Sequence, residues 1–227
     1  MNTPITYLIA HTPRSGAFWL CDVLARNQLG IPDADHAALY IGYGAALAQQ
    51  GTRSIDAFFA DRLADGGGVC GIKTDLAYLE HLAQHIKPLD FKASIFSHVT
   101  HYILLIRENP VEQAVSWYLA KHTGQWTQQD SAKHDVPDYD RAAIDHLVSQ
   151  IHEDNQRWHG IIEAQGVEPL VIVYEEMVKF GGMLRTIKAV CKHLGMAVPK
   201  PLDMGSDAEK LDLPQQAEYV ERYQNGE

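Results

Sequence analysis

Hydrophobic residues along this 227-residue chain form two alternating patterns. Short unbroken apolar runs have the length of strands that are buried on both faces, and Tyr102–Ile106 is the clearest of them. Between the runs, apolar residues recur every three to four positions, as on one face of a helix. This alternation predicts an α/β fold in which parallel strands are joined by right-handed helical crossovers. The predicted strands cover residues 5–10, 69–73, 102–106 and 170–174.

The helical pattern accounts for most of the remaining chain. Ser54 is a candidate N-cap, Pro110 suits the first position of a helix, and Gly195 suits a helix end. The length fits one domain, residues 1–227, with a C-terminal tail over 199–227. Predicted helices cover 17–29, two segments of 37–63, 76–86, 111–122, 139–165, 183–194 and, in the tail, 217–223.

Residues Thr12 to Trp19 connect the first predicted strand to the first predicted helix. Pro13 fixes one φ angle, and Gly16 allows the backbone to turn sharply and to approach a ligand. The first N–H groups of a helix are unpaired and attract anions, and Arg14 adds a planar positive charge. The segment is therefore either a binding loop for a phosphate or sulfonate, or an ordinary strand-to-helix corner with a surface arginine.

Positively charged residues lie at the ends of three predicted strands. Arg14 follows the first strand, Lys73 ends the second and Arg107 follows the third. Because ligands of parallel sheets bind beyond the carboxyl ends of the strands, this convergence favours the anion site. Ser116 lies on the predicted helix that follows Arg107, about two turns in from its start. It is either a ligand for a second phosphate or a small packing residue.

The composition argues against some classes of function. The net charge is −10, and the scattered Lys and Arg residues argue against a nucleic-acid partner. Three distant cysteines, Cys21, Cys70 and Cys191, predict buried free thiols and a reducing, cytoplasmic location. No signal-peptide core or membrane-length apolar run is evident. His81 and His85 lack the intervening glutamate of a zinc motif, so we expect them to face solvent and expect no metal site.

Two motifs resemble those of sulfotransferases that use 3′-phosphoadenylyl sulfate. The segment Thr12-Pro13-Arg14-Ser15-Gly16 resembles their 5′-phosphosulfate loop, and Arg107 to Ser116 resembles their 3′-phosphate motif. More narrowly, the chain resembles the Stf0 family, whose founding activity is 2-O-sulfation of trehalose. Further segments that are similar to this family are residues 71–73, 113–116, 123–126 and 219–223.

The resemblance implies a P-loop-type three-layer sandwich with a central, mostly parallel sheet, and a homodimer. It also implies transfer of the sulfonate of 3′-phosphoadenylyl sulfate to a hydroxyl of a carbohydrate or glycolipid, without a metal. Adenosine 3′,5′-bisphosphate would be the second product.

In that family the two motifs hold the two ends of the donor. By resemblance, Arg14 and the N–H groups of residues 15–19 would hold the 5′-phosphosulfate. Arg107 and Ser116 would hold the 3′-phosphate, and Lys73 would contact the sulfonate or the acceptor. The implied cofactor-binding residues are Arg14, Ser15, Gly16, Ala17, Phe18, Trp19, Lys73, Arg107 and Ser116.

The chain departs from the family pattern at two places. Ala17 stands where the family usually has Ser or Thr, which removes one side-chain contact to the phosphate. The glutamate proposed as the family's general base aligns with Ala34. Its neighbours are the candidates for the base, in the order Asp35, His36 and Asp33. Turn, cap and surface positions are the alternatives for these three residues.

Two other functions fit part of the sequence. The missing glutamate fits a nucleotide-binding module of the same fold that has lost catalysis. A small-molecule kinase of the P-loop type is disfavoured, because the first turn lacks the Gly-Lys-Ser/Thr sequence of Walker A.

Overall fold

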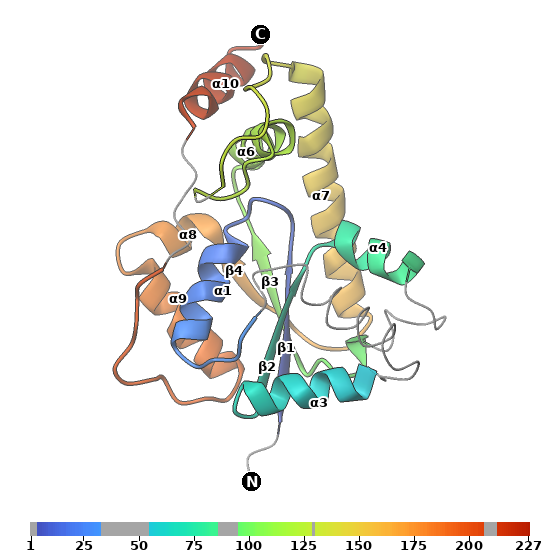
Figure 1. Ribbon diagram of the computed structural model, residues 1–227, viewed down its shortest axis with the longest axis vertical. Coiled ribbons are helices and arrows are strands. Elements are labelled where there is room, and N and C mark those ends of the chain that lie inside the picture. The colour runs from blue at the N-terminus through green and yellow to red at the C-terminus, as the bar shows by residue number, and fades with distance from the viewer. Residues whose placement is uncertain (1–3, 33–54, 86–94, 129, 207–212) are drawn as a thin grey trace.

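The computed structural model describes residues 4–32, 55–85, 95–128, 130–206 and 213–227. In these residues a four-stranded sheet has the order β2-β1-β3-β4, and every neighbouring pair is parallel (Figure 1). At the centre, Ile9 lies opposite Lys73 on one side and Ile103 on the other. The predicted α/β fold with parallel strands is confirmed. The strands are β1 (Ile5–His11), β2 (Val69–Thr74), β3 (His101–Ile106) and β4 (Leu170–Val173).

Helices cover both faces of the sheet, which makes three layers. Alternate residues of β1 point to opposite faces, so Tyr7 and Ile9 join one apolar cluster while Leu8 and Ala10 join another. The first cluster is closed by α1 (Ala17–Arg26), α8 (Tyr174–Val178) and α9 (Gly182–His193). The second is closed by α3 (Ile55–Asp65), α4 (Leu76–His85) and α7 (Arg141–Glu163).

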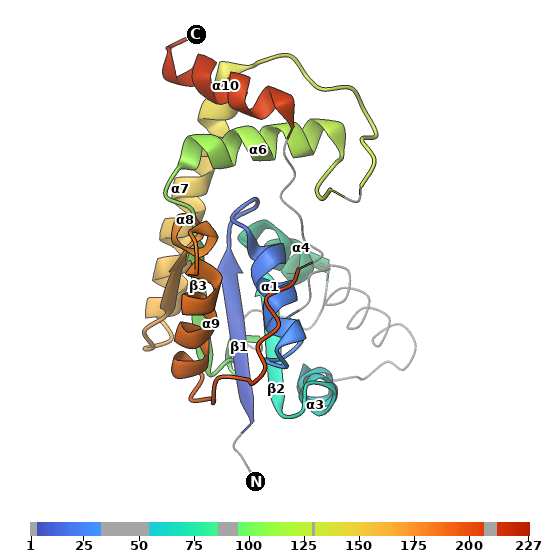
Figure 2. The ribbon, with the colours of Figure 1, turned by 90° about the vertical axis from the view of Figure 1, so that its left-hand side faces the viewer.

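A third apolar cluster lies beyond the carboxyl ends of the strands. It joins α6 (Pro110–Thr123), the first half of α7 and α10 (Pro214–Gln224). Figure 2 shows α6 crossing above the tip of β1. The start of α6 is fixed by Pro110 at its first position and by Asn109, whose side chain accepts the Glu112 N–H at 3.1 Å. One side of α6 thus faces the end of the sheet at which ligands bind.

Several boundaries differ from the sequence predictions by one to three residues, and three of the differences have a local explanation. Tyr174 begins the short helix α8 instead of ending β4. In the tail, α10 begins at Pro214, three residues earlier than expected, because proline fits the first turn. The Asp140 side chain accepts the Ala143 N–H at 3.0 Å and starts α7 at Arg141, two residues later than predicted.

Other expectations are confirmed. All three cysteines are buried free thiols, and the His81 side chain is exposed. Of the two helices expected within 37–63, the second is α3, whereas the first and the candidate N-cap Ser54 lie outside the described residues. No helix in the described part of the chain is long and apolar enough to cross a membrane.

Candidate anion site

The turn between β1 and α1, residues 12–16, has the backbone of an anion-binding loop; we call it the anion loop. Arg14 (φ 66°) and Gly16 (φ 88°) both adopt the left-handed conformation. Left-handed residues beside right-handed ones turn successive N–H groups into one concavity that suits an anion. No side chain caps the start of α1 and no acidic residue lies in its first turn, so those N–H groups face the same concavity.

Ser15 gives independent support for a ligand in this loop. Its side chain is fully buried, and its Oγ has no hydrogen-bond partner among the described residues. A buried hydroxyl without a partner costs about 1–3 kcal/mol, and a phosphate or sulfonate oxygen would satisfy it. The predicted involvement of Ser15 therefore fits the geometry.

Glycine at position 16 is required by packing as well as by φ. An ideal Cβ there would lie 2.5 Å from Cδ2 of Tyr174. The Tyr174 ring, at the start of α8, closes the loop from the side of β4.

Helix α6 holds the anion loop from above. The Gln113 side chain is completely buried, and its Nε2 donates to Thr12 Oγ1 and to the Pro13 carbonyl, both at 2.8 Å. In the described part of the chain, Gln113 Oε1 has no hydrogen-bond partner. The amide therefore fixes the start of the anion loop against α6.

Arg14 reaches from the anion loop to the second predicted motif. Its Nε donates to Ser116 Oγ at 3.0 Å, and its Nη1 donates to the Trp126 carbonyl beyond α6. The residue expected at the 5′ end of the donor thus contacts a residue expected at the 3′ end. Arg14 therefore connects the two predicted motifs.

Arg107 lies beside Arg14 at the end of β3. Its side chain is 5% exposed, and its Nη1 donates to the Arg14 carbonyl at 3.5 Å. The guanidinium also lies over the Tyr174 ring, 4.7 Å from its centroid. Burial, and then the charge of Arg107, lower the pKa of Arg14 to about 10, so Arg14 remains positive at neutral pH. Arg107 is buried and Arg14 is half-buried, and two such cations side by side indicate a site for an anion.

A family model for Stf0 sulphotransferases matches residues 6–226. The chain belongs to the Stf0 sulphotransferase family. No curated protein matches the chain. The match covers every strand and nearly all of the tail, so the anion loop and α6 can be interpreted as parts of a sulfotransferase.

Lys73 lies on the opposite side of the anion loop from Arg107, because β2 and β3 flank β1. Its side chain is 1% exposed, and its Nζ lies 3.6 Å from the centroid of the Phe18 ring. This contact stabilises the buried ammonium group. The three cations predicted from the strand ends therefore surround one loop.

Two of the predicted anion ligands differ from the others in the atoms that they can offer to an anion. Ala17 is buried in the apolar cluster under α1, and the Trp19 side chain packs against the same cluster. Only their backbone N–H groups are therefore available to an anion. The proposed base residues, Asp33, Asp35 and His36, lie outside the described residues.

Carboxylates also lie at the end of the sheet on the side of α4 and α7. Asp75 accepts the Tyr78 N–H at 2.8 Å and so caps the start of α4. Burial, and then the nearby Asp75 and Glu80 carboxylates, raise the pKa of Asp154, while Arg157 opposes this shift. In the described residues no group of three His, Cys, Asp or Glu side chains could hold a metal ion.

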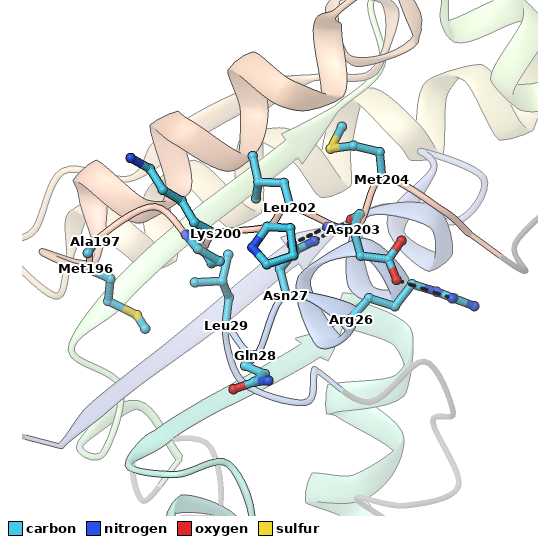
Figure 3. Close-up of a pocket in the computed structure, with 12 residues that line it drawn as sticks. Arg26, Asn27, Gln28, Leu29, Met196, Ala197, Lys200, Leu202, Asp203 and Met204 are labelled. Carbon is cyan, nitrogen blue, oxygen red and sulfur yellow. Dashed lines mark hydrogen bonds and ion pairs between the residues drawn. The ribbon is translucent and has the colours of Figure 1, made fainter.

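A hollow of about 710 Å³ lies at the other end of α1, between Arg26–Leu29 and residues 196–204 (Figure 3). Asn27 bonds both the N–H and the carbonyl of Asp203, and Arg26 pairs with the Asp203 carboxylate at 3.8 Å. The hollow is separated from the anion loop by the length of α1, about 15 Å. It is therefore distinct from the candidate site.

Sequence reasoning missed two residues of this site. Tyr174 and Glu175 follow β4 just as Arg14 and Arg107 follow their strands. Glu175 Oε1 lies 3.6 Å from Arg107 Nε. Considering the residues after every strand, rather than only the cations, would have identified both.

Proposed function

We propose that this sulfotransferase transfers the sulfonate of 3′-phosphoadenylyl sulfate to a hydroxyl of a carbohydrate or glycolipid. The main support is the hydrogen bond between Arg14 and Ser116, with the buried Arg107 beside it. This arrangement provides a second anion position next to the anion loop, which a donor with both 5′ and 3′ phosphates would fill.

The reaction needs no redox partner. The acceptor oxygen attacks the sulfur, the bond between sulfur and the 5′-phosphate oxygen breaks, and adenosine 3′,5′-bisphosphate leaves. Negative charge grows on that phosphate, where Arg14 and the N–H groups of the anion loop would stabilise it. We assign Lys73 to the sulfonate or the acceptor. The acceptor proton would go to Asp35, His36 or Asp33, in that order of preference.

Calorimetric titration of wild type with adenosine 3′,5′-bisphosphate, AMP and ATP tests the donor assignment. We expect the bisphosphate to bind most tightly. Ser116→Ala should weaken its binding about tenfold, since a hydrogen bond to a charged group contributes about 1.5 kcal/mol or more. The affinity of this variant for AMP, which lacks the 3′-phosphate, should fall much less.

Ser149→Ala is the matched control, because Ser149 is an exposed helical serine whose hydroxyl donates to the Asp145 carbonyl on α7. Equal losses for the bisphosphate and AMP in Ser116→Ala would contradict the assignment of Ser116 to the 3′-phosphate. Tight binding of ATP alone would favour a kinase.

A further inference from the structure

Arg107 is paired with two carboxylates that differ in how firmly they are held. Glu112 Oε2 accepts from Arg107 Nη2 at 2.7 Å, and the Glu112 side chain is 44% exposed. Glu175 Oε1 lies 3.6 Å from Arg107 Nε, and its side chain is 27% exposed. The nearer partner of the guanidinium is thus also the more exposed one.

Glu175 is anchored by the backbone at the start of α6. Its Oε2 accepts the Glu108 N–H at 2.9 Å and its Oε1 accepts the Asn109 N–H at 3.2 Å. These bonds connect α8 to the turn between β3 and α6. A carboxylate with two backbone donors and one guanidinium is costly to move, because each bond is charge-assisted.

Glu112 has no comparable anchor in the described structure. Its backbone N–H belongs to the cap of α6, but Arg107 is the one partner recorded for its carboxylate among those residues. Glu112 lies four residues before Ser116, so the two side chains share one face of α6. A phosphate that contacts both Arg107 and Ser116 would therefore meet the Glu112 carboxylate at the same position.

The charges of the side chains around that position cancel one another. Arg14 and Arg107 contribute two positive charges, and Glu112 and Glu175 contribute two negative ones. A phosphate dianion gains full attraction from Arg107 only when one carboxylate withdraws. Exposure and anchoring single out Glu112 as that carboxylate.

We propose that Glu112 is an exchangeable counter-ion that the 3′-phosphate replaces on Arg107, whereas Glu175 is a fixed positioning residue for the same guanidinium. The proposal rests on the donor assignment under "Proposed function". It follows that Glu112 weakens the binding of the bisphosphate product and favours its release. Glu175 strengthens binding by keeping Arg107 directed at the site.

Two isosteric variants test the proposal, because it predicts opposite changes in their affinity for the bisphosphate. Glu112→Gln should raise the affinity for adenosine 3′,5′-bisphosphate about two- to fivefold, the range for a partly exposed ion pair. Glu112→Ala should shift it in the same direction. Glu175→Gln should lower it about fivefold or more, because Arg107 loses its fixed partner. AMP affinity should change little in all three variants, so the ratio of the two affinities is the decisive readout.

Glu108→Gln is the control, since it makes the same change in net charge on an exposed side chain in the turn between β3 and α6. A bisphosphate-to-AMP ratio that moves as much in Glu108→Gln as in Glu112→Gln would overturn the counter-ion role. A ratio unchanged in Glu175→Gln would overturn the positioning role. A wild-type ratio near one would instead refute the donor assignment, and with it this proposal.

Discussion

Gly16 is the residue of the anion loop where backbone and packing leave the least freedom. Its φ is +88°, and an added Cβ would lie 2.5 Å from Cδ2 and 2.9 Å from Cε2 of Tyr174. Gly68 offers a matched control, because its φ is +94° but nothing lies within 4 Å of its Cβ position. Alanine at the two sites therefore carries the same backbone cost and differs in the contact with the ring.

The magnitudes follow from these two contributions. A left-handed backbone costs an alanine about 1–2 kcal/mol, so Gly68→Ala should lower the free energy of unfolding by that amount. Crowding in a packed interior costs about 1–3 kcal/mol. Gly16→Ala should therefore lower the free energy of unfolding by about 2–5 kcal/mol. Adding Tyr174→Leu should recover part of that loss, since it removes the ring that the new methyl group meets.

Urea denaturation measures the stability of the four proteins, and calorimetry measures their affinity for adenosine 3′,5′-bisphosphate. We expect affinity to fall in Gly16→Ala, because the loop must shift, and to persist in Gly68→Ala. Equal losses of stability in the two single variants would refute the argument. They would mean that the Tyr174 ring moves aside at no cost and does not shape the loop.

Three further changes test other parts of the molecule. Lys73→Met should slow sulfonate transfer at least tenfold while bisphosphate affinity changes little, as measured by parallel rate and binding assays. Asp35→Asn or His36→Ala should lower the transfer rate by about 10²–10⁴ with donor affinity intact, and full activity in both would reject these bases. Burial lowers the pKa of His193 and of its neighbour His101. The unfolded chain then binds more protons than the folded one, so wild-type stability should fall as pH drops below about 6.5. The melting temperature of His193→Phe should fall less over that range.

The layers of the fold could be predicted because buried parallel strands leave unbroken apolar runs. The run at Tyr102–Ile106 lies within β3, whose bounds differ from it by one residue. Tyr174 was assigned to β4 because an aromatic residue continues an apolar run equally well. In the structure Tyr174 begins α8 and its ring packs against Gly16, a contact between distant segments that no local pattern encodes.

The candidate site was predictable as a set of strand-end cations but not as a set of contacts. The positions of Arg14, Lys73 and Arg107 around one loop follow from parallel topology alone. The hydrogen bond from Arg14 to Ser116 does not follow from topology, because it also requires α6 to lie at a particular height above the sheet. That height depends on the third apolar cluster, in which α10 packs on α6 from the far end of the chain.

Helix α6 therefore couples the two ends of the proposed donor site. Within five residues, Glu112 contacts Arg107, Gln113 holds the anion loop and Ser116 contacts Arg14. Gln113 and Ser116 both bond residues of the anion loop, so a displacement of α6 would disturb that loop. Under the proposed function, recognition of the 3′-phosphate would therefore depend on the same helix as the shape of the loop that would bind the 5′-phosphosulfate. A donor lacking the 3′-phosphate should consequently be a poor substrate even when its 5′ end is bound.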